Sequence, residues 1–395
     1  MIESGQTLGK TPGEVTTPIP LSLYIHIPWC LKKCPYCDFN SHGLKPDNPL
    51  PEDAYINALL ADLDQELKQS DHRPIHSVFI GGGTPSLFSA HAIGALLAGI
   101  QARCNLQSGA EITLEANPGT FEQARFSDYR ALGINRLSIG IQSFNTNALK
   151  QLGRVHNGRD AIHAVEIAHR AGFDNVNLDL MFGLPGQSLQ QAEEDVKTAM
   201  RLGPAHISYY QLTLEPNTLF YVQPPTLPDD DAIWTIQEQG QALLAEAGYQ
   251  QYEISAYAQP EKKCQHNLNY WLFGDYIGIG AGAHGKITTS VGIIRRSKVR
   301  HPNDYLRGAA NGTLIQTESI ILGESQCLEF MMNALRLTQG FTIETLTQRT
   351  QVKLEDIQPH LQTALNQELI RIDGKKIVPT CKGSLFLNDL LSIFM

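Results

Sequence analysis

The sequence lacks a hydrophobic stretch long enough to cross a membrane. Its 395 residues contain no run of about twenty apolar residues, the length that a transmembrane helix requires. The first twenty residues, MIESGQTLGKTPGEVTTPIP, also lack the basic start and the apolar centre of a signal peptide. We therefore interpret residues 1–20 as a flexible leader. Peripheral contact with a membrane is left open.

Positive charge and cysteine are both in short supply. The chain has 31 Lys and Arg against 40 Asp and Glu, and a formal net charge of −9. This balance argues against a broad electrostatic surface for nucleic acid, so we expect no nucleic-acid partner. The cysteine count of seven is odd, and four cysteines are widely scattered, which does not fit a disulfide framework. We expect a protein of the reducing cytoplasm. The scattered cysteines are Cys104, Cys264, Cys327 and Cys381.

The other three cysteines form a tight group. Cys30, Cys34 and Cys37 are spaced C-x3-C-x2-C and follow an apolar run, residues 21–27, that predicts a strand. Cysteine thiolates ligate iron–sulfur clusters, and three of them would leave one iron of a [4Fe–4S] cube open. An open metal position indicates chemistry, because structural metal sites close their coordination sphere. A zinc site made by these cysteines and His42 is an alternative that the spacing leaves open.

After this group, predicted strands and helices alternate. The helix over residues 52–69 is amphipathic, and strand-like runs then recur at intervals typical of βαβ units. Six such units predict a parallel sheet in an α/β fold, a partial (β/α)6 barrel rather than a closed one. Glu115, Gln142 and Asp179 stand at strand ends, where barrel active sites form. The predicted later strands are 77–80, 111–114, 136–141, 176–182 and 206–213; the predicted later helices are 91–102, one ending near 132, 158–171, 189–202 and 230–247.

The pattern changes towards the C-terminus. Predicted helices at 324–337 and 354–366 precede an Asp-Gly turn between two alternating runs, which predicts a hairpin, and a last helix at 384–393. We interpret this part as a small winged-helix-like α+β domain. It lacks a marked basic excess, so packing or a lid is favoured over DNA binding. The predicted domains are a barrel at 21–258, a connecting segment at 259–322 and the C-terminal domain at 323–395.

The cysteine motif, with Tyr36 directly before its last cysteine, resembles the signature of the radical S-adenosylmethionine (radical SAM) superfamily. Gly81-Gly82-Gly83-Thr84 resembles that superfamily's second motif, and glycines there allow a ligand close to the backbone. The strings YIHIPWC, GGGTPS, LEANP, SIGIQSF, LGRVH and DLMFGLPGQ resemble its coproporphyrinogen dehydrogenase branch. The resemblance implies a [4Fe–4S] cluster on Cys30, Cys34 and Cys37, with SAM on the fourth iron. It implies a SAM site at Tyr24, Tyr36, Gly82, Gly83, Thr84, Glu115, Gln142, Arg154 and Asp179.

Two features bear on the subfamily. The dehydrogenases carry a cysteine two residues beyond the third, but this sequence reads Cys37-Asp38-Phe39. The segment His266-Asn267-Leu268-Asn269-Tyr270-Trp271, here called the HNLNYW segment, resembles a signature of heme chaperones in the same branch. This implies that His266, Tyr270 and Trp271 contact heme and that heme passes to an acceptor hemoprotein. Imidazole is a common heme ligand, and Cys264 is an alternative soft ligand.

Three functional hypotheses result. The first is a heme chaperone, for which coproporphyrinogen oxidase activity is not expected and no catalytic residue is assigned. The second is a radical SAM enzyme that oxidatively decarboxylates a tetrapyrrole propionate. The third is a zinc-stabilised binding module.

Two further segments have more than one interpretation. The glycine-rich residues 278–285 would allow a planar ligand or SAM to approach closely, or they form a turn at the barrel mouth. Arg295, Arg296, Lys298 and Arg300 form a dense basic run. It could bind porphyrin propionates or an anionic lipid surface, but we predict a solvated face.

Overall fold

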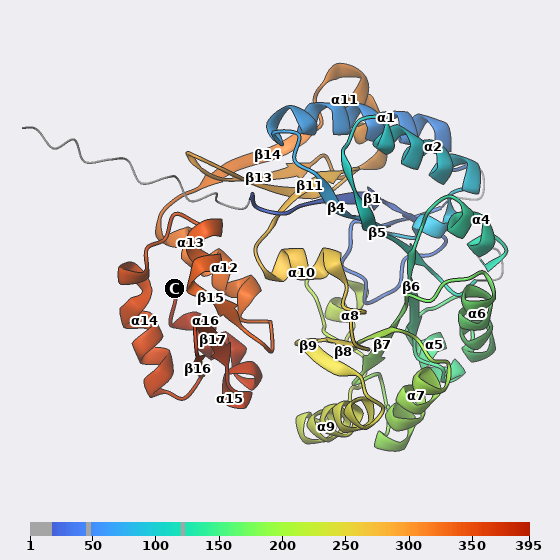
Figure 1. The fold of residues 1–395 in the computed structure, drawn as a ribbon. Helices are drawn as coiled ribbons and strands as arrows, with labels where there is room; N and C mark the ends of the chain where they lie inside the picture. The colour runs from blue at the N-terminus through green and yellow to red at the C-terminus, as the bar shows by residue number, and fades with distance from the viewer. Residues whose placement is uncertain (1–17, 45–48, 120–122) are drawn as a thin grey trace, which may run out of the picture.

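The computed structural model describes residues 18–44, 49–119 and 123–395 (Figure 1). Most of the predicted leader, residues 1–17, lies outside them. No helix among the described residues is long and apolar enough to span a membrane.

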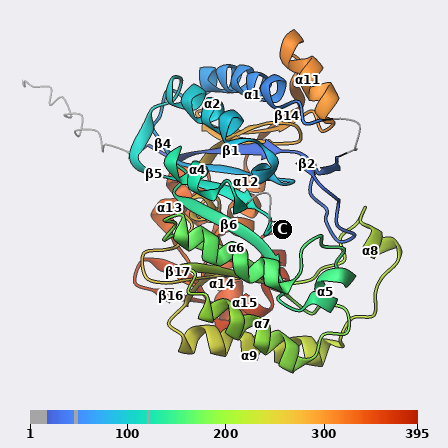
Figure 2. The same ribbon diagram turned by 90° about the vertical axis from the view of Figure 1, so that its right-hand side faces the viewer.

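The main body is one curved, twelve-stranded sheet, in the order β14-β13-β12-β11-β1-β4-β5-β6-β7-β8-β10-β9. The seven strands from β11 to β8 run parallel, and both flanks are antiparallel. Helices cover its outer side, and the sheet stays open on the side where the C-terminal residues lie (Figures 1 and 2). The α/β class and the partial barrel are thereby confirmed.

The six predicted barrel strands are all present. They are β1 (Leu21–Ile27), β4 (Ile75–Gly82), β5 (Leu106–Ala116), β6 (Arg136–Gln142), β7 (Val176–Phe182) and β8 (His206–Gln211). The covering helices are α1 (Glu52–Glu66), α2 (Ala90–Gln101), α4 (Phe126–Ala131), α5 (Thr146–Gln151), α6 (Gly158–Arg170), α7 (Leu189–Arg201) and α9 (Asp230–Glu246). The short helix α8 (Leu219–Val222) instead lies beside the cysteine loop, where the Phe220 amide donates to the Pro35 carbonyl oxygen at 3.0 Å. Strand β5 begins five residues before the predicted start, because its Gly- and polar-rich first half carries no apolar alternation.

The sheet continues beyond β1, which the sequence did not predict. Strand β11 (Asp275–Ile279) pairs with β1 in parallel, and β12 (His284–Thr289), β13 (Gly292–Lys298) and β14 (Ile315–Ile321) follow antiparallel. The opposite flank is made by β9 (Gln250–Glu253) and β10 (Ala256–Ala258). The helix α10 (Gln265–Trp271) lies inside the curve of the sheet, and α11 (Pro302–Asn311) lies outside it beside α1 (Figure 1).

Alternation along β1 explains how the barrel interior becomes polar. Leu21, Leu23 and Ile25 are fully buried on the side that the outer helices cover. Successive side chains of a strand point to opposite faces. Tyr24 and His26 therefore face the interior, where the candidate site lies.

The surroundings of the basic run differ from the predicted solvated face. The run lies on β13, where Lys298 and Arg296 turn towards α1 and are 1% and 7% exposed. Lys298 Nζ is 2.6 Å from carboxylate oxygens of both Asp62 and Glu66. Arg296 pairs with Glu66, and Arg295, on the opposite face, pairs with Glu329. The predicted solvated face is therefore wrong for these three residues, since each is neutralised by carboxylates. Arg300 is exposed.

The glycine-rich segment forms a turn between β11 and β12. A Cβ on Gly278 would stand 1.8 Å from the His284 carbonyl oxygen, and one on Gly280 would stand 2.3 Å from that of His26. Gly280 also has φ +104°, a conformation that favours glycine. These glycines allow neighbouring backbones to approach closely.

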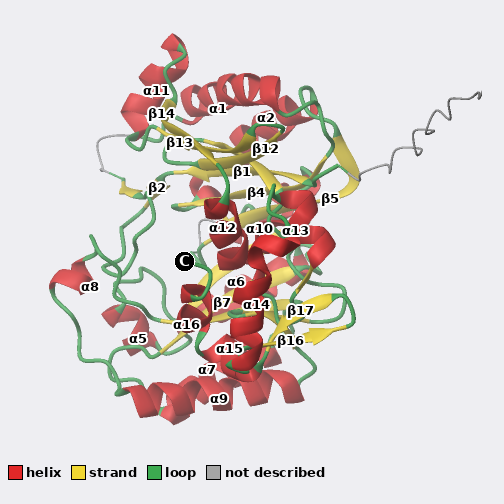
Figure 3. Ribbon diagram, turned by 90° about the vertical axis from the view of Figure 1, so that its left-hand side faces the viewer, coloured by secondary structure: helices red, strands yellow, loops and turns green. Residues whose placement is uncertain are grey.

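The C-terminal residues form a second unit with its own core. Its order is α12 (Glu324–Ala334), β15 (Phe341–Thr342), α13 (Ile343–Arg349), α14 (Leu354–Asn366), β16 (Ile370–Asp373) and β17 (Lys376–Pro379). The strands form the sheet β15-β17-β16, a winged-helix-like arrangement (Figure 3). The predicted last helix is divided at Phe386 into α15 (Cys381–Leu385) and α16 (Leu387–Ser392). Phe273 and Ile293 of the preceding segment join this core, and the predicted domain boundaries stay predictions.

Candidate cluster and cofactor site

The cysteine loop is anchored at its base by backbone hydrogen bonds. Short strands β2 (Trp29–Cys30) and β3 (His42–Gly43) pair in parallel, and the Cys37 amide donates to the Cys34 carbonyl oxygen at 3.2 Å. All three thiols are free, and Cys34 and Cys37 are partly exposed. The loop therefore holds three thiols on one side of a closed turn.

Without a metal, the thiols of Cys30 and Cys37 favour their protonated form. Burial raises the pKa of Cys30 to about 11, and it also raises the pKa of Cys37. Ligation requires thiolates, so a cationic centre must supply the driving force for losing these protons.

The donor set fits a cluster better than a single ion. No three His, Cys, Asp or Glu side chains in the described ranges stand close enough together to hold one metal ion. A zinc site of the cysteines and His42 is therefore not preformed. In a cube each thiolate binds a different iron, so the sulfurs stand further apart than around one ion.

The glycine motif connects β4 to the cysteine loop. The amides of Gly83 and Thr84 donate to the carbonyl oxygens of Ile27 and Trp29, each at 2.7 Å. A Cβ on Gly83 would stand only 2.4 Å from the Trp29 carbonyl oxygen. Glycine is required here because the two backbones are in contact.

Two carboxyl groups lie next to this motif, and no basic side chain of the described residues is in hydrogen-bond contact with either. Glu115 Oε2 accepts from the Gly82 amide at 2.9 Å, and Asp179 accepts from Asn177 and Ser138. Burial, with the nearby Asp179 charge second, raises the pKa of Glu115 to about 8, and burial raises that of Asp179. Such a pair suits a ligand that donates hydrogen bonds or carries positive charge.

Arg154 joins the two sides of the site. Its guanidinium donates to Asn117 Oδ1 and the Gly140 carbonyl oxygen, both at 2.7 Å, and to the Cys34 sulfur at 3.8 Å. Its buried Nε has no hydrogen-bond partner among the described residues. The fixed cation beside Cys34 suits the carboxylate of a ligand or the negative charge that a thiolate-bound cluster would carry.

Gln142 is held in an unusual backbone conformation at the end of β6. Its φ is +67°, and its side-chain oxygen accepts from the Tyr210 hydroxyl at 2.8 Å. Non-glycine residues at positive φ cost free energy and concentrate at functional sites.

These groups line one cavity of about 570 Å³, here called the cluster cavity. Its volume is within the range of small-molecule sites. The predicted site residues that line it are Cys30, Cys34, Cys37, Tyr36, Gly82, Gly83, Thr84, Glu115, Gln142, Arg154, Asp179 and Trp271.

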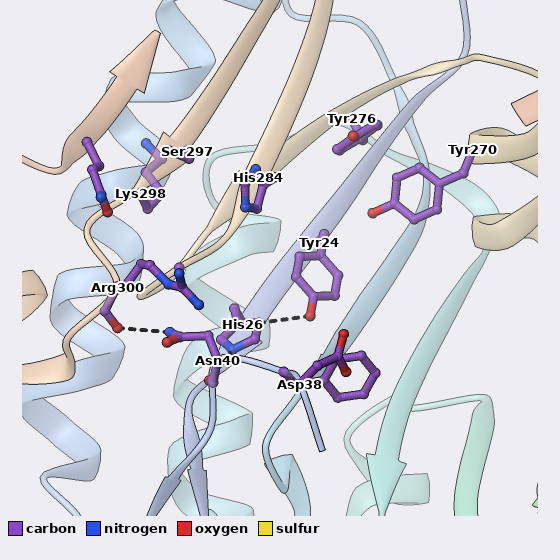
Figure 4. Close-up of a pocket in the computed structure, with 13 residues that line it drawn as sticks. Tyr24, His26, Asp38, Asn40, Tyr270, Tyr276, His284, Ser297, Lys298 and Arg300 are labelled. Carbon is purple, nitrogen blue, oxygen red and sulfur yellow. Dashed lines mark hydrogen bonds between the residues drawn. The ribbon is translucent and has the colours of Figure 1, made fainter. Parts of the chain in front are cut away.

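The predicted residue Tyr24 lies elsewhere. With Tyr270 and Tyr276 it lines a neighbouring cavity of about 510 Å³, here called the tyrosine cavity (Figure 4). Its hydroxyl lies 2.9 Å from His26 Nδ1. Its role in SAM binding stays a prediction.

The HNLNYW segment forms α10, and its side chains divide between the two cavities. Trp271 lines the cluster cavity and Tyr270 lines the tyrosine cavity. His266 is fully buried between them, with Nδ1 3.1 Å from Ser77 Oγ and Nε2 3.1 Å from the Tyr270 hydroxyl. Burial lowers the pKa of His266 to about 3. Both of its ring nitrogens are occupied by protein partners.

Cys264, the alternative soft ligand, is also buried. Its thiol donates to Glu111 Oε1 at 3.4 Å, and burial raises its pKa to about 12. Its thiol is therefore neutral, and Cys264 lines neither of the two cavities.

The chain matches two protein-family models. Residues 24–199 match the radical SAM superfamily, and residues 323–386 match the HemN C-terminal domain. The chain is 51% identical over 377 residues to the heme chaperone HemW of Escherichia coli, covering 95% of this chain and 98% of that protein. The chain belongs to the HemW family. The HemW of Bacillus subtilis is 34% identical, over 95% of this chain and 99% of its own length.

A solved structure supports the same fold for this HemW-family chain. Coproporphyrinogen III oxidase (HemN) of E. coli, a radical SAM enzyme, superposes with a TM-score of 0.80 at 23% identity, covering 95% of this chain and 90% of HemN. At this identity the likeness concerns the fold alone.

In this HemW-family chain the cluster cavity has residues that the sequence analysis missed. Asn117, two residues beyond Glu115, and Ser138 and Ser208, on the inner faces of β6 and β8, could have been found from strand alternation. Arg336, at the end of α12, could not, because it reaches the cavity only through tertiary packing. Its guanidinium pairs with Glu253 at 2.9 Å and stacks 4.4 Å over the Trp271 ring.

Proposed function

We propose that this protein is a cytoplasmic heme chaperone. It binds a [4Fe–4S] cluster and SAM, and it carries heme as cargo to an acceptor hemoprotein. Its relatives named heme chaperones, at up to 51% identity over nearly their whole length, support the proposal. The seven free cysteines suit a reducing compartment.

The cluster would be held by Cys30, Cys34 and Cys37. When bound, a cluster with one open iron supplies a coordination site and one-electron chemistry for SAM. Arg154 is positioned to pair with the SAM carboxylate, while Glu115 and Asp179 are positioned to accept hydrogen bonds from its amino group or ribose. Tyr36, Gly82, Gly83, Thr84 and Gln142 would enclose the rest of the molecule. These assignments are part of the proposal.

Heme would contact the HNLNYW segment through Tyr270 and Trp271. The Trp271 ring lines the cluster cavity, and its buried indole nitrogen has no hydrogen-bond partner among the described residues. His266 belongs to this proposed heme site as well, but for direct contact with iron its Nε2 would have to leave the Tyr270 hydroxyl.

One observation carries the proposal most directly. Trp271 lines the same cavity as the three cysteine thiols. One residue implied for heme is thus a neighbour in space of the residues implied for the cluster, although more than 230 positions separate them in the chain. This adjacency is what a protein that couples heme delivery to a cluster would need.

Heme titration and transfer test the proposal. Anaerobically reconstituted protein should develop a Soret band with heme and should pass heme to a heme-free hemoprotein. Trp271→Ala should weaken heme binding roughly tenfold, about 1.4 kcal/mol. The matched control Trp234→Ala, on the outer helix α9 and 41% exposed, should bind as the unaltered protein does. Consumption of coproporphyrinogen with SAM and reductant, without heme binding, would favour the enzyme instead.

A further inference from the structure

The tyrosine cavity is a second cavity beside the cluster cavity, and Tyr270 of the HNLNYW segment lines it. It lies on the inner face of the sheet, where β1, β11, β12 and β13 run side by side, and the loop after Cys37 closes it (Figure 4). Asp38 and Phe39 of that loop border both this cavity and the cluster cavity. The two cavities are therefore neighbours across two residues of the cysteine loop. The volume of about 510 Å³ is in the range of cofactor-sized ligand sites.

Its walls are rich in aromatic rings. Tyr270 and Tyr276 pack edge-on with ring centroids 4.4 Å apart, and Tyr24 and Phe39 add two more rings. Phe39 is 58% exposed. Large apolar rings around a concave site favour a flat, mostly apolar ligand.

One histidine in the cavity has a free imidazole. His284, the first residue of β12, is exposed, and within the described chain neither of its ring nitrogens has a hydrogen-bond partner. The other two histidines nearby differ. His26 lies 2.9 Å from both the Tyr24 hydroxyl and the Asn40 carbonyl oxygen, and His266 contacts Ser77 and Tyr270. His284 can therefore offer a lone pair to a metal without breaking a protein contact.

The local charges keep this imidazole in its ligating form. Partial burial, followed by the charges of Arg295 and Arg300, lowers the pKa of His284. Neutral imidazole is the form that binds metals. The tyrosine oxygens of the cavity compete poorly for a metal. Burial raises the pKa of Tyr24, Tyr270 and Tyr276, so all three stay protonated phenols.

The same cavity carries an available cation. Arg295, Arg296 and Lys298 of the basic run are paired with carboxylates. Arg300 lines the cavity, is exposed, and forms no ion pair with any residue that the structure describes. Its carbonyl oxygen accepts from Asn40 Nδ2 at 2.8 Å, which fixes its backbone (Figure 4). An arginine without an ion-pair partner among the described residues, at the edge of an aromatic cavity, suits a carboxylate on the ligand.

We propose that the tyrosine cavity is the heme seat, with His284 as the axial ligand of the iron and Arg300 paired with a heme propionate. This inference rests on the proposed heme-chaperone function and specifies its site. On binding, the His284 nitrogen donates its lone pair to the iron and replaces solvent there, with no redox change. Tyr270 links this seat to the HNLNYW segment, so His266 acts as a positioning residue through the Tyr270 hydroxyl. Asp38 and Phe39 border both cavities, so heme in this seat lies next to the cluster cavity, from which side Trp271 would contact it.

The test compares histidine variants of the full-length, cluster-loaded protein in anaerobic heme titrations. The variants are His284→Ala, His266→Ala and the matched control His163→Ala, a half-exposed histidine on the outer helix α6. Soret position and the spin state of the ferric iron report axial ligation, and far-UV circular dichroism confirms folding. His284→Ala should change the spin state and weaken binding at least tenfold, and added imidazole should restore the original spectrum. His163→Ala should behave as the unaltered protein. His266→Ala should keep the axial signature, although its affinity falls.

The arginine is tested by changing both partners. Arg300→Ala should weaken heme binding about fivefold to tenfold, and heme dimethyl ester, which lacks the propionate charges, should lose affinity for the unaltered protein to the same extent. The ester should then bind equally to the unaltered protein and to Arg300→Ala.

The outcomes separate the inference from the function on which it rests. If the unaltered protein binds no heme, the proposed function fails, and this inference fails with it. If it binds heme and His284→Ala leaves spectrum and affinity unchanged, the function stands and the His284 assignment is overturned. The His284 assignment is also overturned if His266→Ala removes the spectroscopic signature of axial ligation and His284→Ala does not. If Arg300→Ala weakens the binding of the dimethyl ester as much as the binding of heme, the proposed contact between Arg300 and a propionate is overturned.

Discussion

Replacing Glu115 by glutamine should stabilise the cofactor-free protein while weakening SAM binding. The carboxyl group borders the cluster cavity next to Asp179, and its pKa is raised from 4.5 to about 8. Below pH 4.5 Glu115 is protonated in the folded and the unfolded chain. As pH rises from 4.5 to 8, the unfolded chain ionises first, so the folded state loses stability across this window. Glutamine stays neutral throughout and avoids this loss.

The magnitude follows from the pKa difference. One pKa unit corresponds to about 1.36 kcal/mol, so the full penalty above pH 8 is at most about 5 kcal/mol. Because Glu115 is only partly buried and borders a cavity, hydration of the carboxylate reduces this, and we expect about 2 kcal/mol. The glutamine carbonyl can still accept from the Gly82 amide, so the loop geometry should persist.

The assay is urea unfolding of cluster-free protein at pH 5, 6, 7, 8 and 9. The difference in unfolding free energy between Glu115→Gln and the unaltered protein should grow with pH and level off above pH 8. Glu238→Gln, an exposed change on α9, should show no such trend. A difference for Glu115→Gln that is constant from pH 5 to pH 9 would refute the reasoning.

Three further predictions concern other parts of the molecule. Lys298→Met leaves the buried Asp62 carboxylate without a cation and removes one of the two cations of Glu66, which keeps Arg296, and should lower the free energy of unfolding by about 3–5 kcal/mol in urea titrations. Arg307→Ala, which breaks an exposed pair, should change it by less than about 1 kcal/mol. Equal effects would show that the buried pairs do not matter. Gly83→Ala should abolish iron uptake by the cysteine loop, measured as iron per chain after anaerobic reconstitution, while Gly43→Ala, whose Cβ would meet nothing within 4 Å, should retain it. Full uptake by Gly83→Ala would contradict the close contact. Cys264 should resist alkylation by iodoacetamide in the folded protein at pH 8, since its pKa is about 12; rapid labelling detected by mass spectrometry would oppose its placement.

Strand patterns along the sequence predicted the barrel well. The apolar residues of β1 and β7 recur at every second position over most of each strand, and this period-two pattern gave their bounds directly. The flank from β11 to β14 was missed for a physical reason. Strand β13 carries three basic residues, and the charges of Arg296 and Lys298 are neutralised by Asp62 and Glu66, more than 200 positions earlier. A run that looks solvated in sequence is therefore buried by partners that only the fold brings close.

Some residues of the candidate site could be predicted from local sequence, whereas the positions of others depend on the fold. Cys30, Cys34, Cys37 and the glycine motif could be predicted because local spacing carries their chemistry. The separation of Tyr270 from Trp271, into different cavities, depends on where α10 lies inside the curved sheet. His284 carried no signal of its own within a glycine-rich segment. Its free nitrogens become visible only when the neighbouring strands are in place.

The most direct test of the account is electron paramagnetic resonance of the anaerobically reconstituted, reduced protein, recorded with and without SAM. We predict a [4Fe–4S] signal that SAM shifts, because three cysteines leave one iron free to bind it, and Cys34→Ser should lose the signal. A cubane signal that SAM leaves unchanged, or a protein that binds zinc and no iron, would contradict the account.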